Sequence, residues 1–254
     1  MNDVIDILES EVLKNNTADF IKDDPVQFPR LFTDLRDIEI VSLLISSIAW
    51  GNRKMILNNS RKLLSLMDHQ PYNFLKDEGF EELPDDLNIH RTFFARNLKH
   101  YLRGLKAVYD KYPSVNEFVK TRKINLDAYP AWKLAAELND IFSRANEELT
   151  DSRCIPANVD TTALKRLNMA LRWLVRNDGK VDLGVWDCLK PSQLFIPLDV
   201  HVGNVSRALG LIERKANDKK TVIDLTEKLR TLNSEDPVKY DFALFGLGVY
   251  NRLS

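Results

Sequence analysis

The chain has 254 residues and a net charge of −1, from 36 basic and 37 acidic side chains, and its 44% hydrophobic and 29% charged content is typical of a soluble globular protein. Its two cysteines, Cys154 and Cys188, are too few for a disulfide framework or for a four-cysteine zinc or iron–sulfur site. The near-zero net charge argues against a protein coated in positive charge for nucleic acid.

The N-terminal segment, residues 1–14, is acidic and amphipathic and has neither a basic region nor a cleavage site, so we expect no secretory signal. The longest apolar stretch, residues 38–50, is interrupted by Glu39 and three serines and is too short and too polar to span a bilayer. We therefore expect a cytoplasmic protein with reduced thiols and no membrane partner. The oligomeric state stays open.

Apolar residues recur at helical spacing through most of the chain, and no useful length of sequence alternates as a strand does. In chain order these repeats cover residues 5–13, 40–48, 56–67, 93–108, 134–142, 164–175, 202–209, 222–232 and 240–247. Stop signals such as Asp24-Pro25, Pro113 and Asp236-Pro237 separate the repeats. The pattern predicts an all-α fold of roughly ten helices.

Charge is distributed unevenly along the chain. Residues 1–24 carry seven acids against two bases, and residues 77–86 carry six acids and no base. Residues 87–106, in contrast, carry only basic charges, and so do residues 53–62. Most such basic runs are solvated helix faces, and the alternative is a surface that faces phosphates.

The segment of residues 196–211 is the most informative part of the sequence. Pro197 disfavours a helical conformation of the residue before it, so Asp199 stands where the cap of an amphipathic helix belongs, and that helix ends at Gly210. A capping role alone would contribute about 1 kcal/mol and would fully account for Asp199.

The same segment resembles the signature of the helix-hairpin-helix DNA glycosylase superfamily, which Pro197, Asp199, His201, Arg207 and the pair Leu209-Gly210 match. In that superfamily the aspartate at the position of Asp199 is the catalytic carboxylate, at the mouth of a cleft that holds the extruded base. The resemblance therefore implies a two-lobed all-α fold with a cleft between the lobes.

Further segments extend the resemblance over nearly the whole chain. Residues 38–50 resemble the first helix of the superfamily's barrel, residues 50–53 its DNA-contacting loop, and residues 93–119 its next two helices. Residues 236–248 resemble the closing helix of the archaeal 8-oxoguanine glycosylases. As a whole the chain most resembles a bacterial branch with no assigned function, whose shared motifs correspond to residues 24–29, 165–169 and 197–199.

This resemblance implies a single glycosylase-like unit made of two lobes. Residues of approximately 36–195 would form the helical barrel with a degenerate hairpin. Residues 1–35 plus 196–254 would form the second helical lobe from both chain ends.

Members that also cleave the strand use a lysine on the second helix of the hairpin, which attacks the anomeric carbon of the sugar and forms a Schiff base. Our candidate is Lys165, which lies off the apolar stripe of its helix and on roughly the same face as Met169. The alternative is a solvated helix lysine. Asp199 would accept the proton and stabilise the developing positive charge, and His201 would support it from the start of the same helix.

The hairpin of the superfamily grips a phosphate through a glycine-containing turn, but residues 157–163 contain no glycine. Asp160, Thr161 or Thr162 would instead cap the helix of Lys165, whose N-terminus would bind phosphate, although Asp160 would repel an anion. Trp50 and Trp186 are candidates for stacking on a base. The candidate DNA contacts are Asn52, Arg53, Arg96, Lys99, Arg103, Thr161, Thr162, Arg172, Arg176 and Arg207.

The resemblance implies a base-excision glycosylase with lyase activity, which acts on a damaged base in double-stranded DNA, an oxidised purine being one candidate. Because two cysteines exclude the iron–sulfur branches of the superfamily, we expect no cofactor and no metal. Two alternatives remain: a catalytically inactive nucleic-acid-binding protein on the same scaffold, and a helical protein that binds a protein partner.

Overall fold

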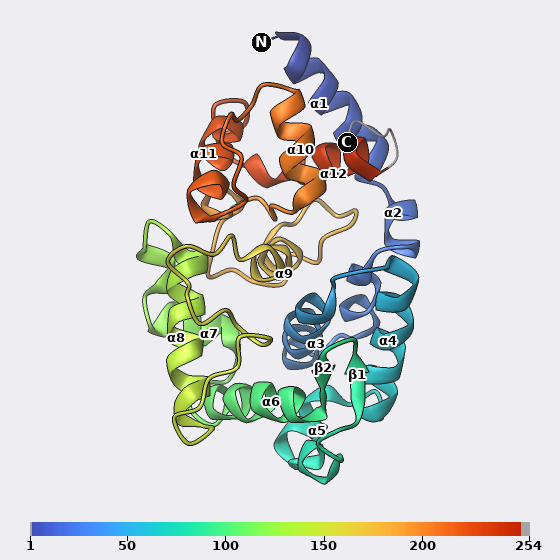
Figure 1. The fold of residues 1–254 in the computed structure, drawn as a ribbon, viewed down its shortest axis with the longest axis vertical. Coiled ribbons are helices and arrows are strands. Elements are labelled where there is room, and N and C mark those ends of the chain that lie inside the picture. Colours follow the sequence, from blue (N-terminus) through green and yellow to red (C-terminus); the bar gives the residue numbers. More distant parts are fainter. Residues whose placement is uncertain (1, 250–254) are drawn as a thin grey trace. The chain divides into compact units, whose positions relative to one another are not determined.

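Helices make up nearly all the regular structure, as the apolar spacing predicts, so the all-α class is confirmed (Figure 1). The structure is a computed structural model that describes residues 2–249. Its α-helices are α1 (Asn2–Asn15), α2 (Ala18–Lys22), α3 (Leu35–Ile48), α4 (Arg53–Leu66), α5 (Pro71–Lys76), α6 (Ala95–Tyr109), α7 (Val115–Thr121), α8 (Pro130–Arg144), α9 (Lys165–Val175), α10 (Val200–Ala208), α11 (Lys219–Arg230) and α12 (Tyr240–Val249).

Short elements join these helices. The 3₁₀ turns are η1 (Pro25–Gln27), η2 (Pro29–Leu31), η3 (Gly79–Glu82), η4 (Ile124–Leu126), η5 (Pro191–Gln193) and η6 (Pro237–Lys239). Strands β1 (Asn88–His90) and β2 (Phe93–Phe94) pair in an antiparallel hairpin with an irregular register. The sequence did not predict this hairpin, because its strands are too short to show a period of two.

The chain forms two units, each with its own core. The central unit comprises Ile21–Val159, and the discontinuous unit comprises Met1–Phe20 with Asp160–Ser254. This division differs from the one that the resemblance implies in two places: residues 21–35 belong to the central unit, and residues 160–195 join the chain ends. The second difference arises because α9 and the segment after it form buried ion pairs with Asp236 and Asp241, near and within α12. Lys165 and Asp199 therefore belong to the same unit.

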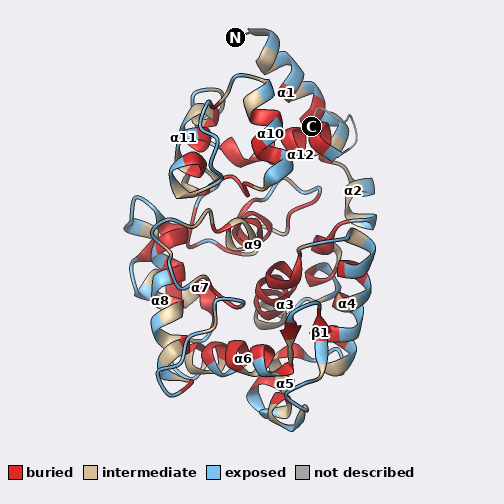
Figure 2. Ribbon diagram, in the orientation of Figure 1, coloured by how far each residue is buried: buried red, intermediate tan, exposed pale blue. Residues whose placement is uncertain are grey.

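Helix α3 forms the core of the central unit, and every residue from Ile38 to Ile48 is buried (Figure 2). Glu39 lies inside this apolar helix, where its carboxylate accepts hydrogen bonds from the Tyr109 hydroxyl at 2.7 Å and from the backbone N–H of Val115 at 2.8 Å. These bonds compensate the carboxylate for its lost hydration.

Helices α6 and α8 approach each other closely at Gly104. A Cβ atom at Gly104 would lie 2.1 Å from Cδ1 of Phe142. Glycine is therefore needed here for space, because the backbone of α6 rests directly on the phenyl ring.

Helix α12 is the centre of the discontinuous unit. Nearly all of its side chains are buried, which is expected of a helix that is apolar on all sides. The Tyr240 hydroxyl donates to Glu9 at 2.7 Å, and Lys239 pairs with Glu9 at 2.8 Å, so α1 is tied to the start of α12. No helix among residues 2–249 combines the length and the hydropathy that a membrane crossing requires.

Candidate functional site

Asp199 lies at the start of α10, where it is half-buried. Its Oδ1 accepts a hydrogen bond from the Val202 N–H at 3.0 Å, which confirms the predicted helix cap. The predicted end of the helix is also confirmed, because Gly210 follows α10 with a φ of 67°. Within residues 2–249 the second carboxylate oxygen, Oδ2, forms no hydrogen bond, so it remains available to a ligand.

Lys165 is the first residue of α9 and is half-buried. Its Nζ lies 3.5 Å from Sδ of Met169, so the two residues share one face of the helix as the sequence predicts. A thioether sulfur is a weak acceptor, so this contact leaves the amine free to act on another molecule.

A third group, Asp241, joins Lys165 and Asp199 in the site. Its carboxyl is buried at the second position of α12; Nη1 of Arg172 donates to Oδ2, while Oδ1 has no hydrogen-bond partner in the structure. Burial raises the pKa of Asp241 to about 6, the charges of Arg172 and Lys165 act to lower that pKa, and the charge of Asp199 acts to raise it. Lys165 and Asp199 thus both lie within electrostatic range of one buried carboxyl.

Sequence reasoning missed Asp241 as a site residue, although the sequence contains a signal for it. It is the single charged residue in the apolar segment 240–249, and a carboxylate within a helix that is buried on all sides requires a partner.

The prediction that Arg172 and Arg176 contact phosphates is wrong, because both side chains are only 4% exposed. Arg172 pairs with Asp182 at 3.2 Å as well as with Asp241. Arg176 pairs with Asp182 at 3.1 Å and with Asp236 at 2.8 Å. The two guanidinium groups are therefore neutralised inside the discontinuous unit.

Trp186 is 4% exposed, which overturns its prediction as an exposed base-stacking residue. The segment that carries it runs back along the end of α9, where the Trp186 N–H donates to Leu174 O and the Leu183 N–H to Trp173 O, both at 2.8 Å. These backbone bonds fold the indole into the core.

The predicted cap of α9 by Asp160, Thr161 or Thr162 is also wrong. The residue at the N-cap position is Leu164, which has a φ of 49°, and its side chain makes no capping hydrogen bond. The main chain of the expected hairpin is engaged elsewhere: Thr161 O accepts from the Lys219 N–H at 2.9 Å, and Thr162 forms a bridge with Asp218.

Arg207 and His201, two predicted site residues of α10, contact the loop after α10 and helix α12. Arg207 donates to Arg214 O and Lys215 O, both at 2.8 Å, so its guanidinium closes the loop after α10, and its contact with phosphate stays a prediction. His201 is exposed and lies against Gly248 of α12, where an added Cβ would be 3.0 Å from the histidine Cβ. Its supporting role stays a prediction.

In the central unit, the basic run of residues 87–106 meets the acidic run of residues 77–86. Lys99 pairs with Asp85 at 2.7 Å, and Arg103 pairs with Glu81 at 2.6 Å. The prediction that Lys99 and Arg103 face phosphates is therefore wrong, since local carboxylates occupy both side chains.

Arg96 is exposed, and its guanidinium lies 4.4 Å from the ring centroid of Phe94. The half-buried Trp50 lies under Arg91, whose guanidinium is 4.5 Å from the ring, so a base could stack on that face of the indole only by displacing the arginine. Asn52 caps α4 through the Met55 N–H at 3.2 Å, and Arg53 beside it is half-buried.

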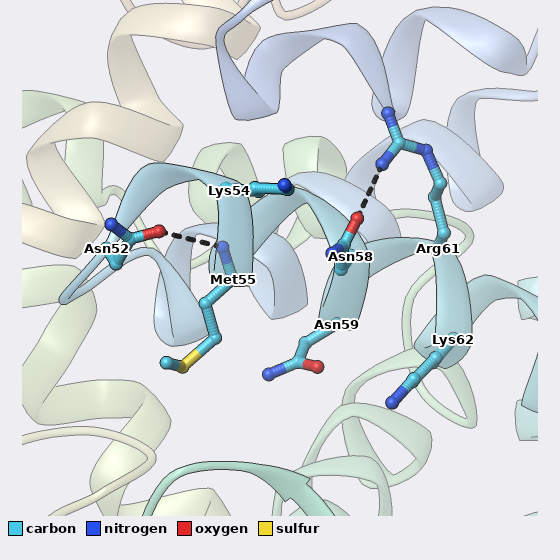
Figure 3. Close-up of a pocket in the computed structure, with 7 residues that line it drawn as sticks. All are labelled: Asn52, Lys54, Met55, Asn58, Asn59, Arg61 and Lys62. Atoms are coloured by element: carbon cyan, nitrogen blue, oxygen red, sulfur yellow. Dashed lines mark hydrogen bonds between the residues drawn. The ribbon is translucent and has the colours of Figure 1, made fainter.

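The exposed face of α4 forms an open pocket of about 510 Å³ (Figure 3). Its polar lining comes from three cations and three asparagines, namely Lys54, Arg61, Lys62, Asn52, Asn58 and Asn59.

For the part of the chain from residue 2 to residue 249, no group of three His, Cys, Asp or Glu side chains has the geometry to hold a metal ion. Cys154 and Cys188 are both buried, and no disulfide joins them in the described part of the chain.

Comparison with known proteins identifies one family. The sequence model of a family described as "Protein of unknown function (DUF2400)" matches residues 24–250. No curated protein and no solved structure matches the chain.

Proposed function

Since the chain belongs to the DUF2400 family, whose description gives no activity, we propose its function from the site itself. The proposed reaction is excision of a damaged base from DNA, with Lys165 as the nucleophile and Asp199 and Asp241 as the assisting carboxylates. One observation supports it above all others. The charges of Lys165 and Asp199, which the sequence singles out, both influence the pKa of the same buried carboxyl, that of Asp241.

The chemistry needs a neutral amine next to groups that accept protons. In the proposed first step Nζ of Lys165 attacks C1′ of the nucleotide, the bond between C1′ and the base breaks, and the base leaves with a proton. A carboxylate accepts the proton that the amine gives up, and a second one stabilises the positive charge on the sugar. Because burial raises its pKa to about 6, Asp241 is a better proton acceptor near neutral pH than a carboxylate with the ordinary pKa of 3.8.

The later steps follow from the bond that Lys165 forms. Opening of the sugar ring at C1′ converts the aminal into an imine, and the imine makes the C2′ proton acidic. Removal of that proton expels the 3′ phosphate by β-elimination, and water then hydrolyses the imine to release the lysine. We propose Asp199 as the base in these steps, because its Oδ2 has no hydrogen bond within residues 2–249.

A second candidate is nucleic-acid binding without catalysis on the same scaffold. This candidate keeps the scaffold without the hairpin grip, and the backbone bond between Thr161 and Lys219 is consistent with that loss, because the segment expected to grip a phosphate instead holds the start of α11. The two candidates differ in one testable way, which is whether Lys165 forms a covalent bond with DNA.

Borohydride trapping tests the proposal directly, since it reduces an imine between a lysine and an abasic site to a stable cross-link. The wild type should cross-link to a duplex with an abasic site or an 8-oxoguanine, and Lys165→Gln should not. Lys219→Gln is the matched control, because Lys219 is also the first, half-buried residue of a helix in the same unit. It should trap like the wild type.

Two carboxamide variants refine the result. Asp199→Asn retains a good helix cap, so a loss of trapping rate of about 100-fold or more would report its chemistry rather than its fold. Asp241→Asn should also slow trapping. The absence of any cross-link across a panel of lesions, or equal trapping by Lys165→Gln, would rule out the proposed reaction and favour the second candidate.

A further inference from the structure

The cations on the exposed face of α4 differ from the other basic clusters of the chain. Lys54, Arg61 and Lys62 are exposed, and within residues 2–249 no carboxylate forms an ion pair with any of them. The reason lies in the sequence, since residues 40–67 contain no acidic residue. In the basic run of α6, in contrast, Lys99 and Arg103 pair with carboxylates of residues 77–86.

Amide groups complete this face. Asn58 accepts a hydrogen bond from Arg61 at 3.1 Å, and Asn59 lies 2.9 Å from Nδ1 of His90. The other ring nitrogen of His90 is 2.9 Å from Trp50 O. Burial lowers the pKa of His90, so the neutral ring donates to Trp50 O and accepts from Asn59. This bond fixes the orientation of the Asn59 amide at the pocket (Figure 3).

We propose that the face of α4 formed by Lys54, Asn58, Asn59, Arg61 and Lys62 binds the sugar–phosphate backbone of DNA. The pocket is open rather than enclosed, and its cations follow the helix axis, which suits a polymer better than a small anion. The choice of DNA as the polymer rests on the proposed function. The charge of the face and its lack of carboxylates do not depend on that function.

The spacing of the cations supports an extended, densely charged ligand. Lys54 and Lys62 are eight positions apart, which places them about 12 Å apart along the helix. The same length of DNA duplex carries about seven negative charges, so one duplex offers phosphates to both lysines at once. Inorganic phosphate is too small to contact both.

The experiment compares the wild type with Lys54→Gln/Lys62→Gln on an undamaged duplex, with binding measured by fluorescence anisotropy over a range of salt concentrations. The control is Lys76→Gln/Lys111→Gln, which removes two exposed lysines from the same unit and leaves the net charge of the two variants equal. Loss of two phosphate contacts should weaken binding about 100-fold at about 0.1 M salt and should reduce the magnitude of the negative slope of log K against log salt by about 1.8. The control should resemble the wild type.

The outcomes separate this inference from the proposed reaction. Equal binding by the α4 variant and its control would overturn the inference, even if Lys165 is trapped on abasic DNA. Conversely, a reduced slope that is specific to the α4 variant supports the inference even if no lesion is ever trapped. Binding to anionic vesicles that requires Lys54 and Lys62, without any such effect on DNA, would also overturn it.

Discussion

The buried carboxyl of Asp241 should make the stability of the protein depend on pH in a defined direction. In the folded protein burial raises its pKa from the ordinary 3.8 to about 6, although the charges of Arg172 and Lys165 partly offset this effect. Asp241→Asn removes the titrating group and keeps the shape of the side chain. The substitution therefore isolates the contribution of this one proton to the free energy of unfolding.

The sign follows from where the proton binds more tightly. Because the folded pKa is the higher one, protonation of Asp241 stabilises the fold at low pH, and this contribution is lost as the pH rises from about 4 through 6. The difference between the two pKa values corresponds to about 3 kcal/mol. The free energy of unfolding of Asp241→Asn, relative to the wild type, should therefore rise by about 2–3 kcal/mol between pH 4 and pH 7.

Urea unfolding followed by circular dichroism at several pH values measures this difference. Asp34→Asn serves as a control of opposite sign, because its hydrogen bonds with Arg36 lower the pKa of Asp34. Relative to the wild type, that variant should lose stability as the pH rises from about 2 to about 4, and should change little between pH 4 and pH 7. A stability difference for Asp241→Asn that is constant or falls between pH 4 and pH 7 would refute the reasoning and would remove Asp241 as the proton acceptor of the proposed reaction.

Two further predictions concern packing within each unit. Arg172→Met leaves buried carboxylates without their arginine and should lower the free energy of unfolding at pH 7 by about 3–5 kcal/mol, whereas Arg122→Met, which breaks an exposed pair with Glu137, should cost about 1 kcal/mol or less. Equal costs in urea unfolding would contradict the buried network. Gly104→Ala should destabilise the protein by about 1–3 kcal/mol, because its Cβ would overlap the ring of Phe142. Helix propensity alone predicts that Gly104→Ala would stabilise the protein by about 1 kcal/mol. A fall in the thermal midpoint would therefore support the close contact with Phe142, and a rise would contradict it.

The sequence was sufficient to predict the structural features that depend on residues close together in the chain. Helical spacing predicted the class and the long helices, and the Pro197–Asp199 pattern predicted the start of α10 together with its cap. The face shared by Lys165 and Met169 was predictable for the same reason, since four positions separate them on one helix.

Partners that are distant in the chain were not predictable from such patterns. Arg172 and Asp241 are separated by 69 positions, and neither residue type reveals that the other neutralises it. Lys99 and Arg103 appeared as free cations in the sequence, yet residues 14 and 22 positions before them supply their carboxylates. Exposure of Trp186 was mistaken because a loop that hydrogen-bonds back onto its own helix carries no periodic signal.

The net charge of −1 is therefore a poor guide to nucleic-acid binding in this chain. Ion pairing removes charge pair by pair, so a basic side chain contributes to an external field chiefly when no carboxylate lies beside it. By that criterion four cations contribute little, since Lys99 and Arg103 meet the acids of residues 77–86, and Arg172 and Arg176 meet the aspartates around α12. The α4 face keeps its charge in a stretch without acids, and a phosphate backbone approaching the protein would be drawn there first.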